Sequence, residues 1–142
     1  MANHRELISR LHPIFEKYNV QTAYLFGSRA DGSAYPDSDY DIACLFDNYD
    51  SIRKDYDFVI SLQMELEEAL APVKIDLVIL NKASIIMRFN IIKHGVILYC
   101  NDDDKRTDFE DIVIRDYLDF KPFIDRFDRD IEEAIQGGNF FA

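Results

Sequence analysis

The chain has 142 residues, of which 48% are hydrophobic and 13% aromatic, with only 5 Gly and 4 Pro. A chain of this size and composition can bury roughly two thirds of its surface in one compact domain, which excludes a disordered or fibrous protein. Its 16 Lys and Arg against 27 Asp and Glu give a formal net charge of −11. This charge argues against a nucleic-acid backbone or an anionic membrane as the main binding partner.

The first third of the chain predicts a helix and two strands joined by a loop. Apolar residues recur at steps of three and four from about residue 5 to residue 18, the pattern of one helical face. Residues 20–26 predict a short strand. Residues 27–38 are rich in Gly, Ser, Asp and Pro and predict a loop that begins with a single helical turn. Residues 39–46 again have the character of a strand.

The middle of the chain predicts alternating helices and strands. The longest predicted helix runs over about residues 51–70. Residues 73–80 are apolar nearly throughout, which predicts a strand buried on both faces, with Asp76 as the one carboxylate inside it. Residues 83–94 predict a further helix, and residues 96–100 a final short strand.

The C-terminal third predicts two more amphipathic helices and carries most of the negative charge. The first runs over about residues 109–120, and Pro122 starts the second, which Gly137 and Gly138 end. Residues 101–142 hold 13 acidic and 6 basic side chains. The apolar faces of these helices either pack on the sheet or remain available to a partner protein.

These elements predict a single α/β domain over residues 1–142, with a core at about 1–100 and a helical extension at about 105–137. No run of 18 apolar residues and no apolar leader occurs, so we expect a soluble, cytoplasmic protein.

Neither the cysteines nor the histidines form a site in the sequence. Cys44 and Cys100 lie in apolar stretches without metal-ligand spacing, which predicts core residues rather than a zinc site or a disulfide. His94 precedes Gly95 and is expected at a helix end, where a partial positive charge suits the carbonyl groups.

Three carboxylates stand where core packing would not place them. Asp39 and Asp41 are two apart in a predicted strand, so their side chains share a face at a spacing of roughly 6 to 7 Å. Mg²⁺ favours such oxygen ligands and usually retains waters and substrate phosphates. Asp76 is the natural third ligand if its strand lies beside the first, because a buried carboxylate needs a counter-charge. The alternative for the Asp-x-Asp pair is a solvated turn or sheet edge.

A Gly-Ser pair precedes these carboxylates. Gly27 and Ser28 follow the end of a predicted strand, so backbone N–H groups and the Ser28 hydroxyl could face an anion, while Gly27 permits close approach. Taken alone, the Gly-Ser pair predicts an ordinary turn. From average residue usage, Gly-Ser followed after ten residues by Asp-x-Asp is expected by chance only on the order of once in several hundred chains of this length.

The segment GSRADGSAYPDSDYDIACLF, residues 27–46, resembles the GSx10DxD signature of nucleotidyltransferases of the DNA polymerase β superfamily. The carboxylate in VKIDLVIL also stands where that family places its third acid. The short chain resembles the minimal nucleotidyltransferases, and among them most closely the MNT antitoxins encoded beside HEPN-domain ribonuclease toxins. The resemblance covers residues 20–80 well and the helical tail more weakly.

The resemblance implies a polymerase β-like fold, a mixed β-sheet flanked by helices, with two Mg²⁺ ions at its site. It implies that Asp39 and Asp41 hold the metal and the nucleotide phosphates, and that Asp76 completes the catalytic site near the attacking hydroxyl.

The resemblance also implies ATP as co-substrate. Gly27 and Ser28 would bind its triphosphate. Arg29 would either neutralise phosphate charge or be a solvated loop residue.

By this resemblance, the chain is expected to transfer AMP from ATP to a tyrosine of a cognate HEPN toxin and so neutralise it. A second hypothesis is an antitoxin that binds and covers the toxin without catalysis, through the acidic C-terminal helices. A third is small-molecule nucleotidyl transfer of the aminoglycoside type, which usually requires a second domain for the acceptor.

Overall fold

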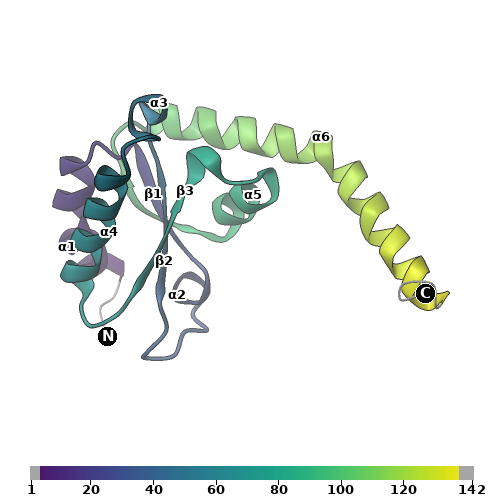
Figure 1. Ribbon diagram of the computed structural model, residues 1–142, viewed down its shortest axis with the longest axis horizontal. Coiled ribbons are helices and arrows are strands. Elements are labelled where there is room, and N and C mark those ends of the chain that lie inside the picture. Colours follow the sequence, from purple (N-terminus) through teal and green to yellow (C-terminus); the bar gives the residue numbers. More distant parts are fainter. Residues whose placement is uncertain (1–3, 138–142) are drawn as a thin grey trace.

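The computed structural model describes residues 4–137 and is built on a four-stranded mixed sheet (Figure 1). The strands are β1 (Thr22–Phe26), β2 (Tyr40–Leu45), β3 (Ile75–Ile79) and β4 (Val96–Cys100). Their order across the sheet is β3-β2-β1-β4, with β1 antiparallel to both β2 and β4, and β2 parallel to β3. The expected small mixed sheet flanked by helices is therefore confirmed.

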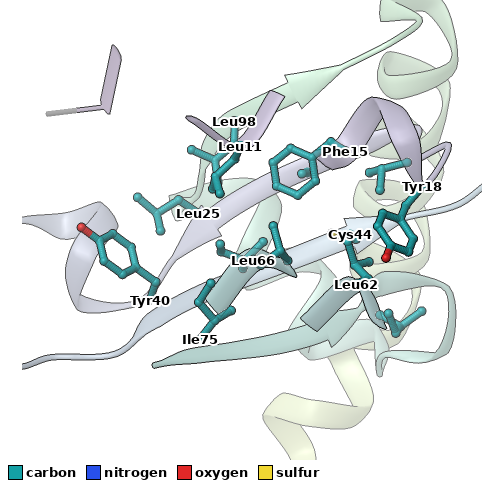
Figure 2. Close-up of a cluster of buried hydrophobic side chains, with 14 of the residues drawn as sticks. Leu11, Phe15, Tyr18, Leu25, Tyr40, Cys44, Leu62, Leu66, Ile75 and Leu98 are labelled. Carbon is teal, nitrogen blue, oxygen red and sulfur yellow. The ribbon is translucent and has the colours of Figure 1, made fainter. Parts of the chain in front are cut away.

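Helices α1 (His4–Lys17) and α4 (Tyr56–Leu70) cover one face of the sheet, as Figure 1 shows. Side chains in a strand alternate between faces, and those on this face form the larger core cluster (Figure 2). Helix α1 contributes Leu11 and Phe15 to it, α4 contributes Leu62 and Leu66, and the expected core residue Cys44 is fully buried.

The opposite face carries a smaller cluster, which α5 (Ile85–His94) and the start of α6 (Asp103–Gln136) cover. Its buried residues are Tyr24, Ala43, Leu45, Leu80 and Ile91, and Phe109 of α6 packs against them. The two clusters fix the direction of each strand residue, because odd and even positions of a strand belong to different faces.

The segment predicted as one helix over residues 51–70 is two helices, α3 (Tyr49–Ile52) and α4. The carboxylate of Asp55 accepts a hydrogen bond of 3.1 Å from the N–H of Phe58 and so caps α4 at its start. The apolar rhythm continues through this cap, which is why periodicity alone missed the break.

The strand predicted to be buried on both faces is the edge strand β3. It pairs only with β2, so Asp76 is exposed and Val78 half-buried. The expectation of a buried Asp76 is therefore wrong. Cys100 also lies on an edge strand, β4, and is half-buried rather than in the core.

The two predicted C-terminal helices are one helix, α6, of 34 residues, which replaces residues 51–70 as the longest. Pro122 lies inside it, and Figure 1 shows the helix bending near the middle of its length. The apolar period stays in phase across the proline, so the helix continues although one backbone hydrogen bond is lost. Gly137 caps its end, while Gly138 lies outside the described residues. None of the described helices combines the length and hydropathy needed to cross a bilayer.

A polar network fastens the start of α6 to the centre of the sheet. The buried Tyr24 hydroxyl donates a 3.0 Å hydrogen bond to Glu110, whose two carboxylate oxygens accept from Arg106 at 2.8 and 3.1 Å. Burial, and then the charge of Glu110, raise the pKa of Tyr24, so its hydroxyl remains a donor. Further along, Tyr117 stacks on Phe89 of α5 at 3.7 Å between ring centroids.

We expect Glu110→Ala to lower the free energy of unfolding by about 1–3 kcal/mol, because it leaves a buried hydroxyl and a guanidinium group without their shared acceptor. Urea denaturation measures this. Tyr24→Phe should cost less, since Glu110 keeps Arg106. Asp111→Ala, at the exposed neighbouring position of α6, should change stability by less than about 0.5 kcal/mol. Equal stability of Glu110→Ala and Asp111→Ala would contradict the anchoring role.

Candidate active site

The parallel pairing of β2 with β3 brings two of the three predicted carboxylates together. Asp41 and Asp76 are direct partners in this register. Ala43 and Val78, two positions further along each strand, belong to the cluster under α5. Because side chains alternate, Asp41 and Asp76 also point to the α5 face of the sheet.

Asp39 lies one residue before β2 rather than inside it, and it is exposed. It nevertheless belongs to the same charged group, because its charge acts on Asp41. Burial, then Asp76, then Asp39 raise the pKa of Asp41 above its ordinary value. The site thus holds like charges close together, an arrangement that a bound cation relieves.

The donor set suits Mg²⁺ completed by a substrate rather than a preformed protein cage. Within residues 4–137, no three His, Cys, Asp or Glu side chains are already arranged as a metal-binding cluster. Mg²⁺ in nucleotide sites usually takes one or two carboxylates and fills its remaining positions with waters and phosphates. The paired Asp41 and Asp76, with Asp39 exposed beside them, fit this pattern.

Gly27 touches the carboxylate group directly. It follows Phe26, which pairs with Asp41 across β1 and β2. A Cβ atom at residue 27 would stand 2.1 Å from Oδ2 of Asp41, and the backbone has φ 72° and ψ −155°, a region almost restricted to glycine. Both the conformation and the close approach therefore require glycine here.

The chain turns immediately after Gly27 into the short helix α2 (Ser28–Asp31), which confirms the predicted helical turn. The Gly27 carbonyl accepts from the N–H groups of Ala30 and Asp31 at 3.0 and 3.2 Å. Ser28 is the first residue of this turn and half-buried, beside the glycine that touches Asp41. The Gly-Ser pair and the carboxylates, separated in sequence, thus lie at the same end of the sheet.

An open cavity of about 660 Å³ adjoins Gly27 on the α5 side of the sheet. Its walls are Phe26, Gly27 and Asp31 on one side and Ser84, Ile86, Met87, Asn90, Ile91 and His94 of α5 and its N-cap on the other. The size and the mostly apolar lining with a few polar groups are typical of small-molecule sites.

Sequence reasoning missed the α5 wall of this cavity. It placed His94 at a helix end, which is confirmed, but His94 also lines the cavity. The available signal in the sequence was the number of apolar residues in α5, which exceeds what one buried helical face needs. In the structure, Ile86 and Met87 of this helix remain 44% and 42% exposed.

Arg29 is already engaged by the loop before β2. Its Nη2 donates to the carbonyls of Ser38 at 2.7 Å and Pro36 at 3.2 Å, and its Nε donates to Ser38 at 3.2 Å. The guanidinium also lies over the Tyr40 ring, 4.4 Å from the centroid. These contacts do not test whether it also binds phosphate, which stays a prediction.

Residues 9–104 match the family described as polymerase beta, nucleotidyltransferase. This match spans more than half of the chain, including the Gly-Ser pair and all three carboxylates. The chain therefore belongs to the polymerase β nucleotidyltransferase family, as the resemblance predicted.

Solved toxin–antitoxin structures share the fold over nearly the whole chain. One, crystallised with AMP-PNP, has a TM-score of 0.73 and 24% identity over 88% of this chain and 98% of that chain. An MNT antitoxin in complex with a tri-AMPylated HEPN toxin from Shewanella oneidensis has a TM-score of 0.70 and 22% identity over 92% of this chain and 99% of that chain. A mutant MntA-HpeT complex has a TM-score of 0.71 and 26% identity over 93% of this chain and 99% of that chain. No curated protein matched the chain.

A matched pair of glycine variants tests the contact between Gly27 and Asp41. We expect Gly27→Ala to weaken Mg²⁺-dependent ATP binding by about tenfold or more, as found when groups that orient metal ligands are changed. Gly32→Ala also places a side chain at positive φ, 83°, in the less restricted left-handed helical region, and its Cβ atom would meet nothing within 4 Å. It should destabilise the fold and leave binding unchanged. Titration calorimetry with ATP and Mg²⁺ distinguishes the two, and equal binding losses would contradict the contact's role.

Proposed function

We propose that this chain is an antitoxin that transfers AMP from ATP to a tyrosine hydroxyl of a HEPN ribonuclease toxin. The observation that carries the proposal is the register that pairs Asp41 with Asp76 beside the Gly27 turn, on a chain of the nucleotidyltransferase family. The likeness to an MNT antitoxin bound to a tri-AMPylated toxin supports this acceptor.

Each residue of the site has a task in this reaction. Asp39 and Asp41 would hold Mg²⁺ ions together with the nucleotide phosphates. When bound, the metal ions supply charge stabilisation for the attacking and leaving oxygens of an in-line displacement. Gly27 and Ser28 would bind the triphosphate, because the glycine lets the backbone approach and the serine offers a hydroxyl donor.

The nucleoside would occupy the cavity of about 660 Å³ under α5. Phe26, Ile86 and Met87 offer apolar surface to a base. Hydrogen bonds from Ser33 lower the pKa of Asp31, so at neutral pH its carboxylate is an acceptor for a hydroxyl or amino group of the nucleoside.

The exposed Asp76 suits the acceptor side of the site, because a protein hydroxyl can reach it. In the transfer, the tyrosine oxygen forms a bond to the α-phosphorus, while the bond from that phosphorus to the bridging oxygen breaks and pyrophosphate leaves. Asp76 would receive the hydroxyl proton. The products are AMP-tyrosine on the toxin and pyrophosphate.

The partner would dock on the distal half of α6. Val113 in the proximal half is 2% exposed, whereas Phe123 and Phe127 on the same helix are 63% and 65% exposed. Figure 1 shows this half projecting away from the sheet. The helix carries twelve acidic and six basic residues, a charge that suits a basic, RNA-binding partner such as a ribonuclease.

This helix also favours a second candidate function, in which binding alone covers the toxin. An apolar face of this extent, continuing the phase of a buried face, could occlude a partner without any chemistry. The two functions differ in whether the toxin acquires a covalent adduct.

The decisive experiment is to co-express the chain with its proposed HEPN toxin partner and to measure the toxin's intact mass. With the wild-type chain we expect one or more AMP adducts. With Asp39→Asn/Asp41→Asn we expect none, and the toxin should regain its ribonuclease activity. Asp37→Asn, an exposed carboxylate in the same loop, is the matched control and should leave the adduct in place. Full neutralisation by the double variant without any adduct would overturn the enzymatic proposal in favour of occlusion.

Substitutions on α6 test the docking surface. We expect Phe123→Ser and Phe127→Ser each to cost the complex about 2 kcal/mol, as aromatic anchors in interfaces do. The chain's own stability should change by less than about 0.5 kcal/mol, because both rings are exposed. Met64→Ser on α4 removes a side chain of equal exposure, 65%, and should not affect binding. Calorimetric affinities equal to wild type for both phenylalanine variants, or self-association of the chain through these residues, would count against this surface.

A further inference from the structure

Arg29 and the catalytic carboxylates lie on opposite faces of the sheet. Tyr40 stands between Asp39 and Asp41 in the chain, and its ring belongs to the core cluster under α1 and α4 (Figure 2). The Arg29 guanidinium lies over this ring, 4.4 Å from its centroid. Asp41 points to the other face, toward α5. The guanidinium is therefore held behind the carboxylates, on the face of the sheet away from the cavity beside Gly27.

The cavities lead to the same conclusion. Arg29 lines an open cavity of about 560 Å³ together with Arg10, Pro36, Tyr40 and Leu70. None of the described residues lines both this cavity and the cavity beside Gly27.

The hydrogen bonds of Arg29 end on the backbone that carries Asp39. Two of its nitrogens donate to the Ser38 carbonyl, at 2.7 and 3.2 Å, and one also donates to Pro36 at 3.2 Å. Ser38 immediately precedes Asp39. A charged donor contributes stronger hydrogen bonds than a neutral one, and the planar guanidinium presents its donors in a fixed geometry that a lysine lacks.

We propose that Arg29 is a positioning residue that clamps residues 36–38 against α2 and Tyr40 and so sets where Asp39 stands relative to Asp41. The other hydrogen bonds of this turn join Tyr35 and Ser38 to each other, and the exposed Asp39 is followed by Tyr40, whose N–H donates to the Lys74 carbonyl at 3.0 Å. Helix α2 therefore has two roles. It begins with the Gly-Ser pair, and its Arg29 side chain holds the loop that carries Asp39, the first proposed metal ligand. The inference rests on the proposed function for the role of Asp39 and Asp41, but not on the toxin as acceptor.

The test measures Mn²⁺ binding to the nucleotide-free protein by electron paramagnetic resonance. Arg29→Ala and Arg29→Lys should both weaken Mn²⁺ binding by about tenfold or more, the loss typical of groups that orient metal ligands. Lysine should not rescue, because it cannot donate to both carbonyls while stacking on Tyr40. Arg10→Ala removes the same charge from the same cavity, but the Arg10 side chain donates no hydrogen bond to residues 36–38, so this variant should bind Mn²⁺ like wild type.

Amide hydrogen exchange gives a second readout that needs neither metal nor activity. Exchange of the Tyr35 and Ser38 amides should accelerate in Arg29→Lys and in Tyr40→Leu, which removes the ring under the guanidinium, while thermal melts verify that both variants are folded. Unchanged exchange and unchanged Mn²⁺ binding would overturn the proposal. The proposal would also be overturned if Arg29→Lys bound Mn²⁺ like wild type and changed only the KM for ATP. That result would indicate that residue 29 contacts the triphosphate directly. If the Mn²⁺-binding and exchange results are as expected but no toxin adduct forms, only the proposal of a protein acceptor is rejected.

Discussion

The parallel pairing of β2 with β3 holds two carboxylates side by side that repel each other. Asp41 and Asp76 are direct partners in the register, and the raised pKa of Asp41 reflects burial first and this repulsion second. The sheet tolerates the arrangement because a separate core under α1 and α4 holds the strands in place from the other face. The remaining features of the site, the Gly27 turn and the cavity under α5, are placed relative to this pair.

Helix α6 has two parts with different physical roles. Its first turns pack Phe109 on the smaller core, bury Val113 and are fastened by Glu110. Beyond them, the same helical face continues without a cover from the described residues, as the exposure of Phe123 and Phe127 shows. Continuity of the period explains why Pro122 bends the helix without ending it, and the uncovered face is why we propose a partner there.

Local patterns predicted most elements, and the errors share one cause. The strands, α1, α5 and the turn at Ser28 were predicted because each is encoded by a short periodic or turn-forming segment. The break at Asp55, the continuous α6 and the exposure of Asp76 were missed. Each of these depends on which cap forms or on what lies beside the segment, and neither is visible in a periodicity.

The sequence by itself indicated the family: a Gly-Ser pair followed after ten residues by an Asp-x-Asp pair resembles the nucleotidyltransferase signature, and the family match confirms it. Only the tertiary structure decided that Asp41 meets Asp76, that α5 lines the cavity, and that Arg29 lies behind the carboxylates. The physical reason is that side-chain alternation assigns a residue to one of two faces, but the pairing of strands and the packing of helices decide what each face meets.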